Sequence, residues 1–147
     1  MTEEMTANSC LPKILVLDQD DIFHFIVDKI FNREGHHYEI MNYTNITGAI
    51  SFLIENANNE KELPDVILLE LYFHSDQDGW IFLDLFEKIK ERLVKVPKVL
   101  VVSYTINHTD IGKANARQTI FDFVSKPLDD ASINLIKTLA EGNSVNE

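Results

Sequence analysis

Four short apolar runs, each followed by a polar residue, constrain the fold of this chain more than any other feature. They are 14–17 before Asp18, 66–69 before Glu70, 99–102 before Ser103, and 121–125 before Lys126. Short runs rich in Val and Ile, separated by longer segments with helical periodicity, are typical of buried parallel strands. Because the carboxyl ends of such strands share one edge of the sheet, we expect two carboxylates, a hydroxyl and an ammonium to gather there.

The pattern around these runs predicts five strand–helix units. Strands are predicted at 13–17, 37–41, 65–69, 99–103 and 120–124. Helices are predicted at 21–33, 45–56, 79–93, 107–117 and 129–139. The first helix carries a mostly apolar stripe on adjacent turns, namely Ile22, Phe25, Ile26, Lys29 and Ile30. Five units joined by right-handed crossovers predict a three-layer α/β sandwich.

Length and composition limit the classes of function. The chain is long enough for one domain, which we assign to 12–141, with 1–11 a disordered lead and 142–147 a frayed tail. The formal net charge of −11 argues against nonspecific binding to nucleic acid or an anionic membrane, because both need basic patches. The single cysteine, Cys10, forms no internal disulfide, so a cytoplasmic location is expected. No apolar run reaches the length of a membrane span, and the acidic N-terminus is unlike a signal peptide.

Together these residues resemble the receiver domain of two-component response regulators, of the chemotaxis type. The matching positions are Asp18 and Gln19 at the family's acidic pair, Pro64 to Glu70 at the strand that ends in the phospho-accepting aspartate, Asp78-Gly79 in the following loop, Ser103 at the switch serine or threonine, Phe123 at the aromatic switch position, and Lys126-Pro127. The resemblance covers about 13–139. It implies a flavodoxin-like fold with a five-stranded parallel sheet in the order 2-1-3-4-5 and five helices.

Two departures fall within this constellation. Gln19 replaces a metal-binding carboxylate, and Glu70 replaces the nucleophile. The resemblance implies a Mg²⁺ site formed by the acidic pair, the acceptor and the backbone of Tyr72, and Mg²⁺ demands near-ideal octahedral geometry. Glutamate extends its carboxylate by one carbon–carbon bond, about 1.5 Å. A misplacement of about 1 Å costs on the order of 100-fold in a positioned reaction. We therefore expect weak metal binding at most and no normal phosphorylation.

Two interpretations of Glu70 stay open. It either pairs with Lys126 and holds an active-like arrangement without phosphorylation, or it is a solvated loop carboxylate. Asp18 is a site residue or only a helix-entry residue, and Ser103 is a site hydroxyl or the cap of the following turn. Trp80 is expected in the core. The five histidines lack metal-ligand spacing and are expected at the surface or in loops.

The sequence predicts a single-domain receiver-like signalling module that acts by protein–protein interaction rather than as an enzyme. Its expected partners are a sensor histidine kinase or a downstream signalling protein, recognised by the face that combines the helix at 107–117, the strand at 120–124 and the last helix. A homodimer stays open. The main alternative is a receiver that still accepts a phosphoryl group from a histidine kinase with Mg²⁺. A flavodoxin-type cofactor binder is disfavoured, because the first strand–helix turn lacks a Gly or Ser/Thr cluster for a phosphate.

Overall fold

The computed structural model describes residues 11–72, 74, 78–104, 111–113 and 117–142. Strands and helices alternate along it as follows: β1 (Lys13–Leu17), α2 (Asp21–Phe31), β2 (Glu39–Tyr43), α3 (Ile46–Glu55), β3 (Val66–Leu69), α4 (Asp78–Ile89), the 3₁₀ turn η1 (Lys90–Arg92), β4 (Lys98–Ser103), β5 (Ile120–Ser125) and α6 (Asp130–Ala140). Of the helix predicted at 107–117, the described part includes 111–113, which are helical, and Arg117, which is not. The predicted lead and tail lie almost wholly outside the described residues.

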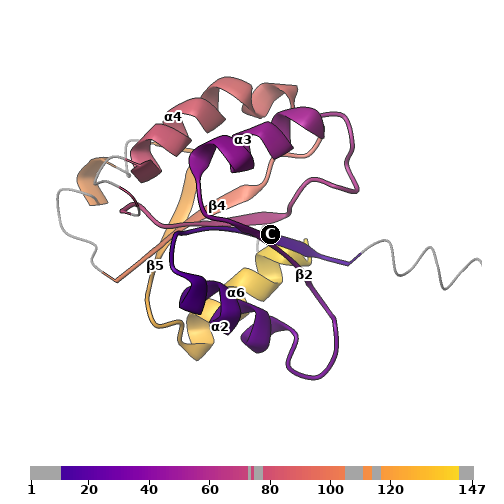
Figure 1. Cartoon of the computed structure of the whole chain (residues 1–147), viewed down its shortest axis with the longest axis vertical. Coiled ribbons are helices and arrows are strands. Elements are labelled where there is room, and N and C mark those ends of the chain that lie inside the picture. Colours follow the sequence, from indigo (N-terminus) through magenta and orange to yellow (C-terminus); the bar gives the residue numbers. More distant parts are fainter. Residues whose placement is uncertain (1–10, 73, 75–77, 105–110, 114–116, 143–147) are drawn as a thin grey trace, which may run out of the picture.

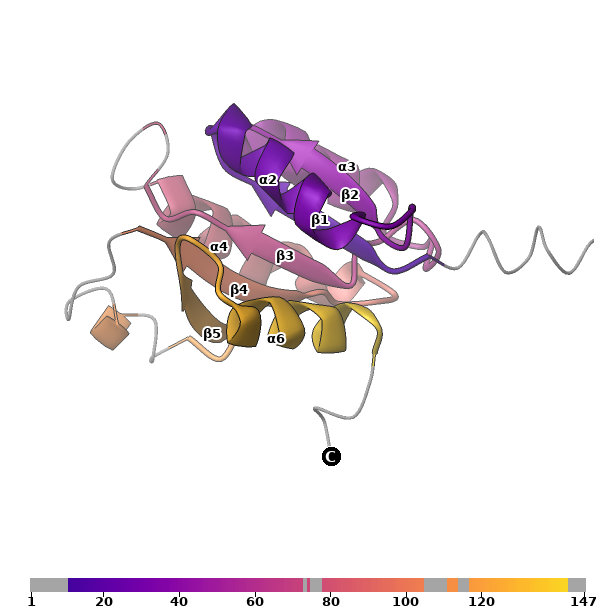
Figure 2. The same cartoon turned by 90° about the horizontal axis from the view of Figure 1, so that it is seen from below.

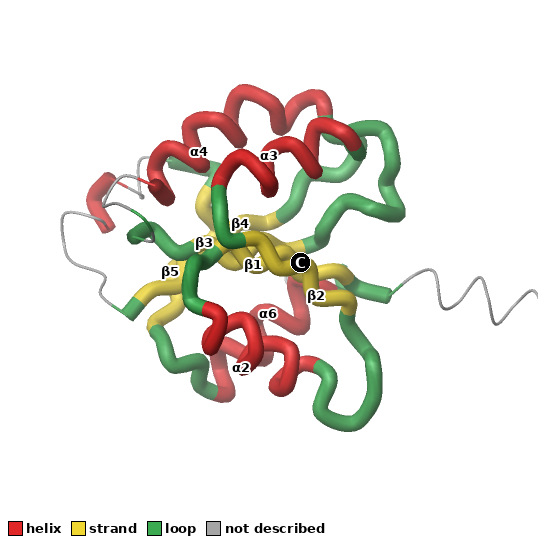
Figure 3. Tube along the Cα trace, viewed as in Figure 1, coloured by secondary structure: helices red, strands yellow, loops and turns green. Residues whose placement is uncertain are grey.

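The five strands form one parallel sheet in the order β2-β1-β3-β4-β5. Helices α3 and α4 cover one face of this sheet, and α2 and α6 cover the other (Figure 1). Figure 2 shows α2 and α6 in front of the strands, and Figure 3 shows the sheet as a middle layer between the two pairs of helices. The predicted three-layer α/β sandwich with the flavodoxin-like strand order is confirmed.

Alternate residues of the central strands enter two separate cores. Leu15 and Leu17 of β1 pack with α3 and α4, whereas Ile14 and Val16 pack with α2 and α6. This alternation follows from the period of two in side-chain direction along a strand. All five residues of β1 are buried, which explains its nearly continuous apolar sequence. Trp80 lies in the α3–α4 core, as predicted.

The apolar stripe noted on the first helix does not face the core. Ile22, Phe25 and Ile26 are 69%, 61% and 42% exposed. The buried face of α2 consists of Phe23, His24, Val27 and Phe31. A search for apolar periodicity misplaces this face because one of its members is a histidine, whose hydrogen bonds allow its burial. The expectation that the histidines lie at the surface or in loops is likewise wrong for His24.

The second strand begins two residues later than predicted, at Glu39. The side-chain oxygen of Asn32, the residue that ends α2, accepts the backbone N–H groups of both His37 and Tyr38 at 2.9 Å. These bonds hold the two residues in the turn and delay pairing with β1 until Lys13 faces Glu39. Within the described residues, no helix is both long enough and apolar enough to cross a membrane.

Candidate functional site

Four of the predicted site residues meet at the carboxyl edge of the sheet. Asp18 follows β1, Glu70 follows β3, Ser103 ends β4 and Lys126 follows β5. The backbone joins neighbouring members: the N–H of Glu70 donates to the carbonyl of Leu17 at 3.1 Å, and the N–H of Lys126 donates to the carbonyl of Ser103 at 3.0 Å. All four residues are buried, with exposures of 2% to 7%. We call Asp18, Glu70, Ser103 and Lys126 the quartet.

Lys126 bridges the two carboxylates of the quartet. Its ammonium donates to Oδ2 of Asp18 at 2.6 Å and to Oε1 of Glu70 at 3.1 Å. The hydroxyl of Ser103 donates to Oε2 of Glu70 at 2.7 Å, and the N–H of Tyr72 donates to the same oxygen at 3.1 Å. The N–H of Asp20 donates to Oδ1 of Asp18 at 2.9 Å. Each of the four carboxylate oxygens therefore already accepts at least one hydrogen bond.

Burial and charge act in opposite directions on Lys126. Burial alone would lower the pKa of this lysine, because it penalises the charged form. The hydrogen bond and charge of Asp18, followed by those of Glu70, outweigh that effect and raise the pKa above its ordinary value. The ammonium also lies 4.2 Å from the centroid of the Phe23 ring and 5.0 Å from that of Tyr104, in the range of cation–π attraction. Lys126 is therefore held as a cation at the centre of the site.

His24 hydrogen-bonds to the backbone of a quartet residue, Asp18, and the sequence pattern did not predict this contact. Its Nε2 lies 2.7 Å from the carbonyl oxygen of Asp18, and its Nδ1 lies 2.7 Å from the side-chain Oδ1 of Asn42. A carbonyl oxygen can only accept a hydrogen bond, so Nε2 donates to the carbonyl of Asp18. This ring ties the turn after β1 to β2. The signal that could have found it is its position on the buried face of α2, one residue after Phe23.

The other predicted residues are Gln19, Phe123, Pro127 and Tyr72. Gln19 is exposed, and Phe123 is half-buried against the α3–α4 core. Pro127 is exposed and follows a cis peptide bond. Tyr72 contributes its backbone N–H to Glu70. The roles assigned to these residues stay predictions.

Gly79 allows the start of α4 to pass close to Glu70 and Leu71. A Cβ at this glycine would lie 2.5 Å from Cα of Leu71 and 3.0 Å from the carbonyl oxygen of Glu70. The N–H of Gly79 donates to the carbonyl of Leu71 at 2.9 Å, which fixes the start of α4 against the residue after Glu70. The Asp-Gly pair of the sequence pattern thus has a steric reason at its glycine.

The donor set of the quartet does not fit a Mg²⁺ ion. One oxygen of each carboxylate, Oδ2 of Asp18 and Oε1 of Glu70, accepts from the Lys126 ammonium. The second oxygen of Glu70 accepts from Ser103, and the second oxygen of Asp18 accepts from a backbone N–H group. Magnesium needs several oxygen ligands in octahedral geometry, and Gln19, at the family's second metal-binding position by resemblance, is exposed and has an amide in place of a carboxylate. Among the residues that the structure describes, no cluster of three or more His, Cys, Asp or Glu side chains suits a metal ion.

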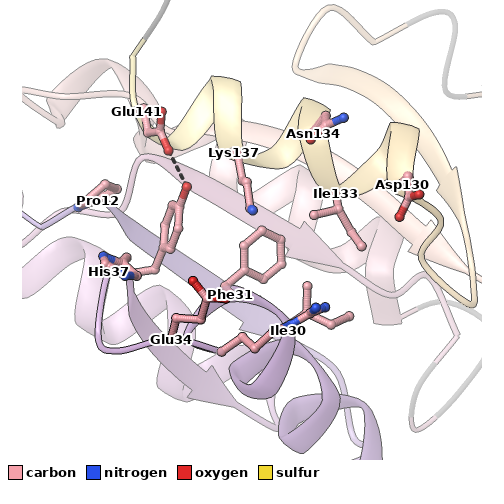
Figure 4. Close-up of a pocket in the computed structure, with 12 residues that line it drawn as sticks. Pro12, Ile30, Phe31, Glu34, His37, Asp130, Ile133, Asn134, Lys137 and Glu141 are labelled. Carbon is pink, nitrogen blue, oxygen red and sulfur yellow. Dashed lines mark hydrogen bonds between the residues drawn. The ribbon is translucent and has the colours of Figure 1, made fainter.

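A hollow in the surface lies between α2 and α6, away from the quartet (Figure 4). Its volume is about 750 Å³. Phe31 is one of the residues that line it, and the hydroxyl of Tyr38, another lining residue, donates to the carboxylate of Glu141. Burial, followed by the bond and charge of Glu141, raises the pKa of Tyr38 above its ordinary value. Both basic and acidic side chains line this hollow, so its charge does not select one kind of ligand.

Comparisons with known proteins agree with this architecture. Neither a protein-family model nor a curated protein sequence matches the chain. Among solved structures, a two-component response regulator from Cytophaga hutchinsonii is 25% identical with a TM-score of 0.73, and the match covers 89% of this chain and 97% of that one. A two-component response regulator from Legionella pneumophila is 22% identical with a TM-score of 0.72, covering 88% and 98%. The signal receiver domain of an HD domain-containing protein from Pseudomonas fluorescens Pf-5 is 17% identical with a TM-score of 0.71, covering 90% and 89%.

The chain therefore has the flavodoxin-like receiver-domain fold found in response regulators of two-component signalling. The quartet lies at the edge of the sheet where parallel α/β folds place their functional groups.

Proposed function

We propose that this chain is an atypical receiver module, in which Glu70 takes the place of a phosphorylated aspartate and partner recognition proceeds without phosphorylation. The observation that carries the proposal is the double engagement of Glu70. Its two oxygens bind Ser103 at 2.7 Å and Lys126 at 3.1 Å, the two groups that the family resemblance assigns to the switch. The burial of Glu70, 7% exposed, argues against the solvated-loop alternative.

Electrostatics supports the proposal. A phosphoryl group brings a charge of about −1.5 to −2, and a carboxylate brings −1. The longer glutamate side chain offsets part of that deficit by reaching both the hydroxyl and the ammonium. Admitting a phosphoryl group would require Lys126 to leave its present partners, and it would add like charge beside Asp18 in a buried site.

An exposed apolar surface supports recognition of a protein partner. Ile22, Phe25 and Ile26 lie exposed on α2, which begins three residues after Asp18. A contiguous apolar patch on a folded domain marks an interaction site more often than chance exposure does. We therefore propose a sensor histidine kinase or a downstream signalling protein as the partner, and the single cysteine, Cys10, fits a cytoplasmic setting for it.

Intact-mass measurement after incubation with Mg²⁺ and acetyl phosphate tests the proposal. We expect the natural chain to gain no phosphoryl group, and we expect the double variant Gln19→Asp with Glu70→Asp, which restores both family carboxylates, to gain one. A stoichiometric adduct on the natural chain would instead support the alternative of a phosphorylatable receiver. If neither protein reacts, the two substitutions are not what blocks the chemistry.

Nuclear magnetic resonance tests the role of Glu70 in holding the switch residues. In Glu70→Gln we expect the backbone amides of Ser103, Phe123 and Lys126 to shift, because the amide cannot accept from both donors. Unchanged amides at these positions would show that Glu70 does not set their arrangement.

A further inference from the structure

The end of the sheet opposite the quartet carries a concentration of positive charge. Residues 88–98 contain five Lys or Arg and one Glu, whereas the formal net charge of the whole chain is −11. This segment runs from the end of α4 through η1 to the first residue of β4. Lys98 begins β4 and Ser103 ends it, so the two lie about 16 Å apart along the strand. The positive segment is therefore remote from the quartet.

A small cavity opens beside this segment. Its volume is about 230 Å³, and the residues that line it include Phe86, Lys90, Val96, Lys98, Thr119 and Phe121. Phe86 is fully buried, while Val96 and Phe121 are 49% and 41% exposed. Its two charged lining residues, Lys90 and Lys98, are both positive. We call this site the basic cavity.

Neither lysine of the basic cavity pairs with a carboxylate among the described residues, so both can pair with a negatively charged ligand. The ammonium of Lys90 donates to the hydroxyl of Thr119 at 3.2 Å, and that of Lys98 lies 5.9 Å from the centroid of the Phe121 ring. Within the described residues, neither forms an ion pair with a carboxylate, in contrast to Lys95 with Asp65. These contacts orient the two ammonium groups without neutralising them.

We propose that the basic cavity docks an acidic peptide segment of a partner protein, with one apolar side chain in the cavity between carboxylates that pair with Lys90 and Lys98. The volume lies below the roughly 300–1,000 Å³ typical of small-molecule sites, and it suits a single side chain. The exposed Val96 and Phe121 provide the apolar wall. The lysines provide the selection for negative charge.

Charge favours a short peptide over two other occupants. A second copy or an anionic membrane would face the field of a chain with a net charge of −11, and both would be repelled. A short segment at the cavity feels mainly the charges within a Debye length, about 8 Å at physiological ionic strength. The larger hollow between α2 and α6 offers no such selection, because it mixes basic residues with Glu34, Asp130 and Glu141.

Titration of the ¹⁵N-labelled full chain with a peptide that carries one leucine between flanking aspartates and glutamates tests this docking site. We expect the amides of Val96, Lys98 and Phe121 to shift. The double variant Lys90→Glu with Lys98→Glu should lose about tenfold in affinity, since two attractive surface pairs become repulsive. A peptide with serine in place of the leucine should bind more weakly to the natural chain.

The matched control is Lys29→Glu with Lys137→Glu, which changes the net charge equally on other elements. It should retain affinity within about twofold, because the effect of surface charges is local. Equal loss in both double variants, shifts elsewhere, or no shift at millimolar peptide would overturn the proposal. Self-association or binding to anionic vesicles that the Lys90→Glu, Lys98→Glu variant abolishes would assign the site to another occupant and would also overturn it. None of these outcomes depends on whether Glu70 replaces a phosphoryl group.

Discussion

Replacing Glu70 with glutamine is the sharpest perturbation of the quartet. The variant keeps the size of the side chain and removes its charge. Both oxygens of Glu70 accept from donors: Lys126 on one side, and Ser103 with the N–H of Tyr72 on the other. An amide has one acceptor oxygen and one donor nitrogen. In either orientation of the amide, its NH₂ group therefore faces a donor. If it faces Ser103 and Tyr72, the hydroxyl of Ser103 can rotate to avoid it, but the backbone N–H of Tyr72 cannot.

The cost follows from the bonds that are lost. Hydrogen bonds to charged groups contribute about 1.5–3 kcal/mol each. Removing one member of a buried ion pair costs about 3–5 kcal/mol when the other member is left without a partner. Lys126 keeps Asp18 at 2.6 Å, so the lower range applies. We expect Glu70→Gln to lower the free energy of unfolding by about 2 kcal/mol, which for a chain of this size lowers the melting temperature by about 4–8 °C.

Urea unfolding at neutral pH measures this loss, and Glu91→Gln is the matched control. Glu91 is exposed on η1, and changes at such positions usually stay within about 0.5 kcal/mol. With a slope of about 2 kcal/mol per molar urea, Glu70→Gln should lower the midpoint by about 1 M. A loss no larger than that of the control would refute the reasoning, because it would mean that the bonds of Glu70 contribute nothing net to folding.

Three further predictions follow from other contacts. The pKa of Lys126 is higher in the folded state than in the unfolded state, where it is about 10.4, so its ion pairs contribute stability that is fully present below about pH 10.4 and is lost as pH rises through the folded-state pKa. The natural chain should therefore have a higher urea midpoint than Lys126→Met at neutral pH, and this difference should shrink at alkaline pH. Gly79→Ala should cost about 3 kcal/mol by thermal unfolding, because its Cβ would meet backbone at 2.5 Å, whereas Gly112→Ala, with no atom within 4 Å, should be nearly neutral. Phe25→Ser should leave the melting temperature almost unchanged, whereas Phe23→Ala should cost about 3 kcal/mol; equal losses would contradict the observed orientation of α2.

The layers of the fold and the membership of the quartet could be predicted because both depend on strands. Buried parallel strands have nearly continuous apolar sequences, and the first polar residue after each one lies at the shared edge of the sheet. Asp18, Glu70, Ser103 and Lys126 lie at that edge in the structure. Their mutual contacts then follow from strand order, which came from the family resemblance and not from periodicity.

The orientation of α2 could not be predicted in the same way. Apolar periodicity finds a stripe on this helix whose members Ile22, Phe25 and Ile26 are exposed. The buried stripe contains His24, whose burial depends on its hydrogen bonds to the Asp18 carbonyl, in the turn before the helix, and to Asn42 of β2. The start of β2 depends similarly on the side chain of Asn32. Hydrogen bonds of single polar side chains decided both features, and the periodicity of apolar residues does not reveal such bonds.

A fixed glutamate changes what this site can regulate. In a phosphorylatable site, the arrangement of the switch residues depends on a phosphoryl group that is added and removed. Here the quartet is complete within the chain, and the Lys126 ammonium occupies the space between both carboxylates. Under the proposed function, the arrangement is therefore constant, and the same bonds that stabilise it oppose both a metal ion and a phosphoryl group. Regulation must then act through the partner or through a second surface, and the proposed basic cavity at the opposite end of β4 is one described surface that is remote from the quartet.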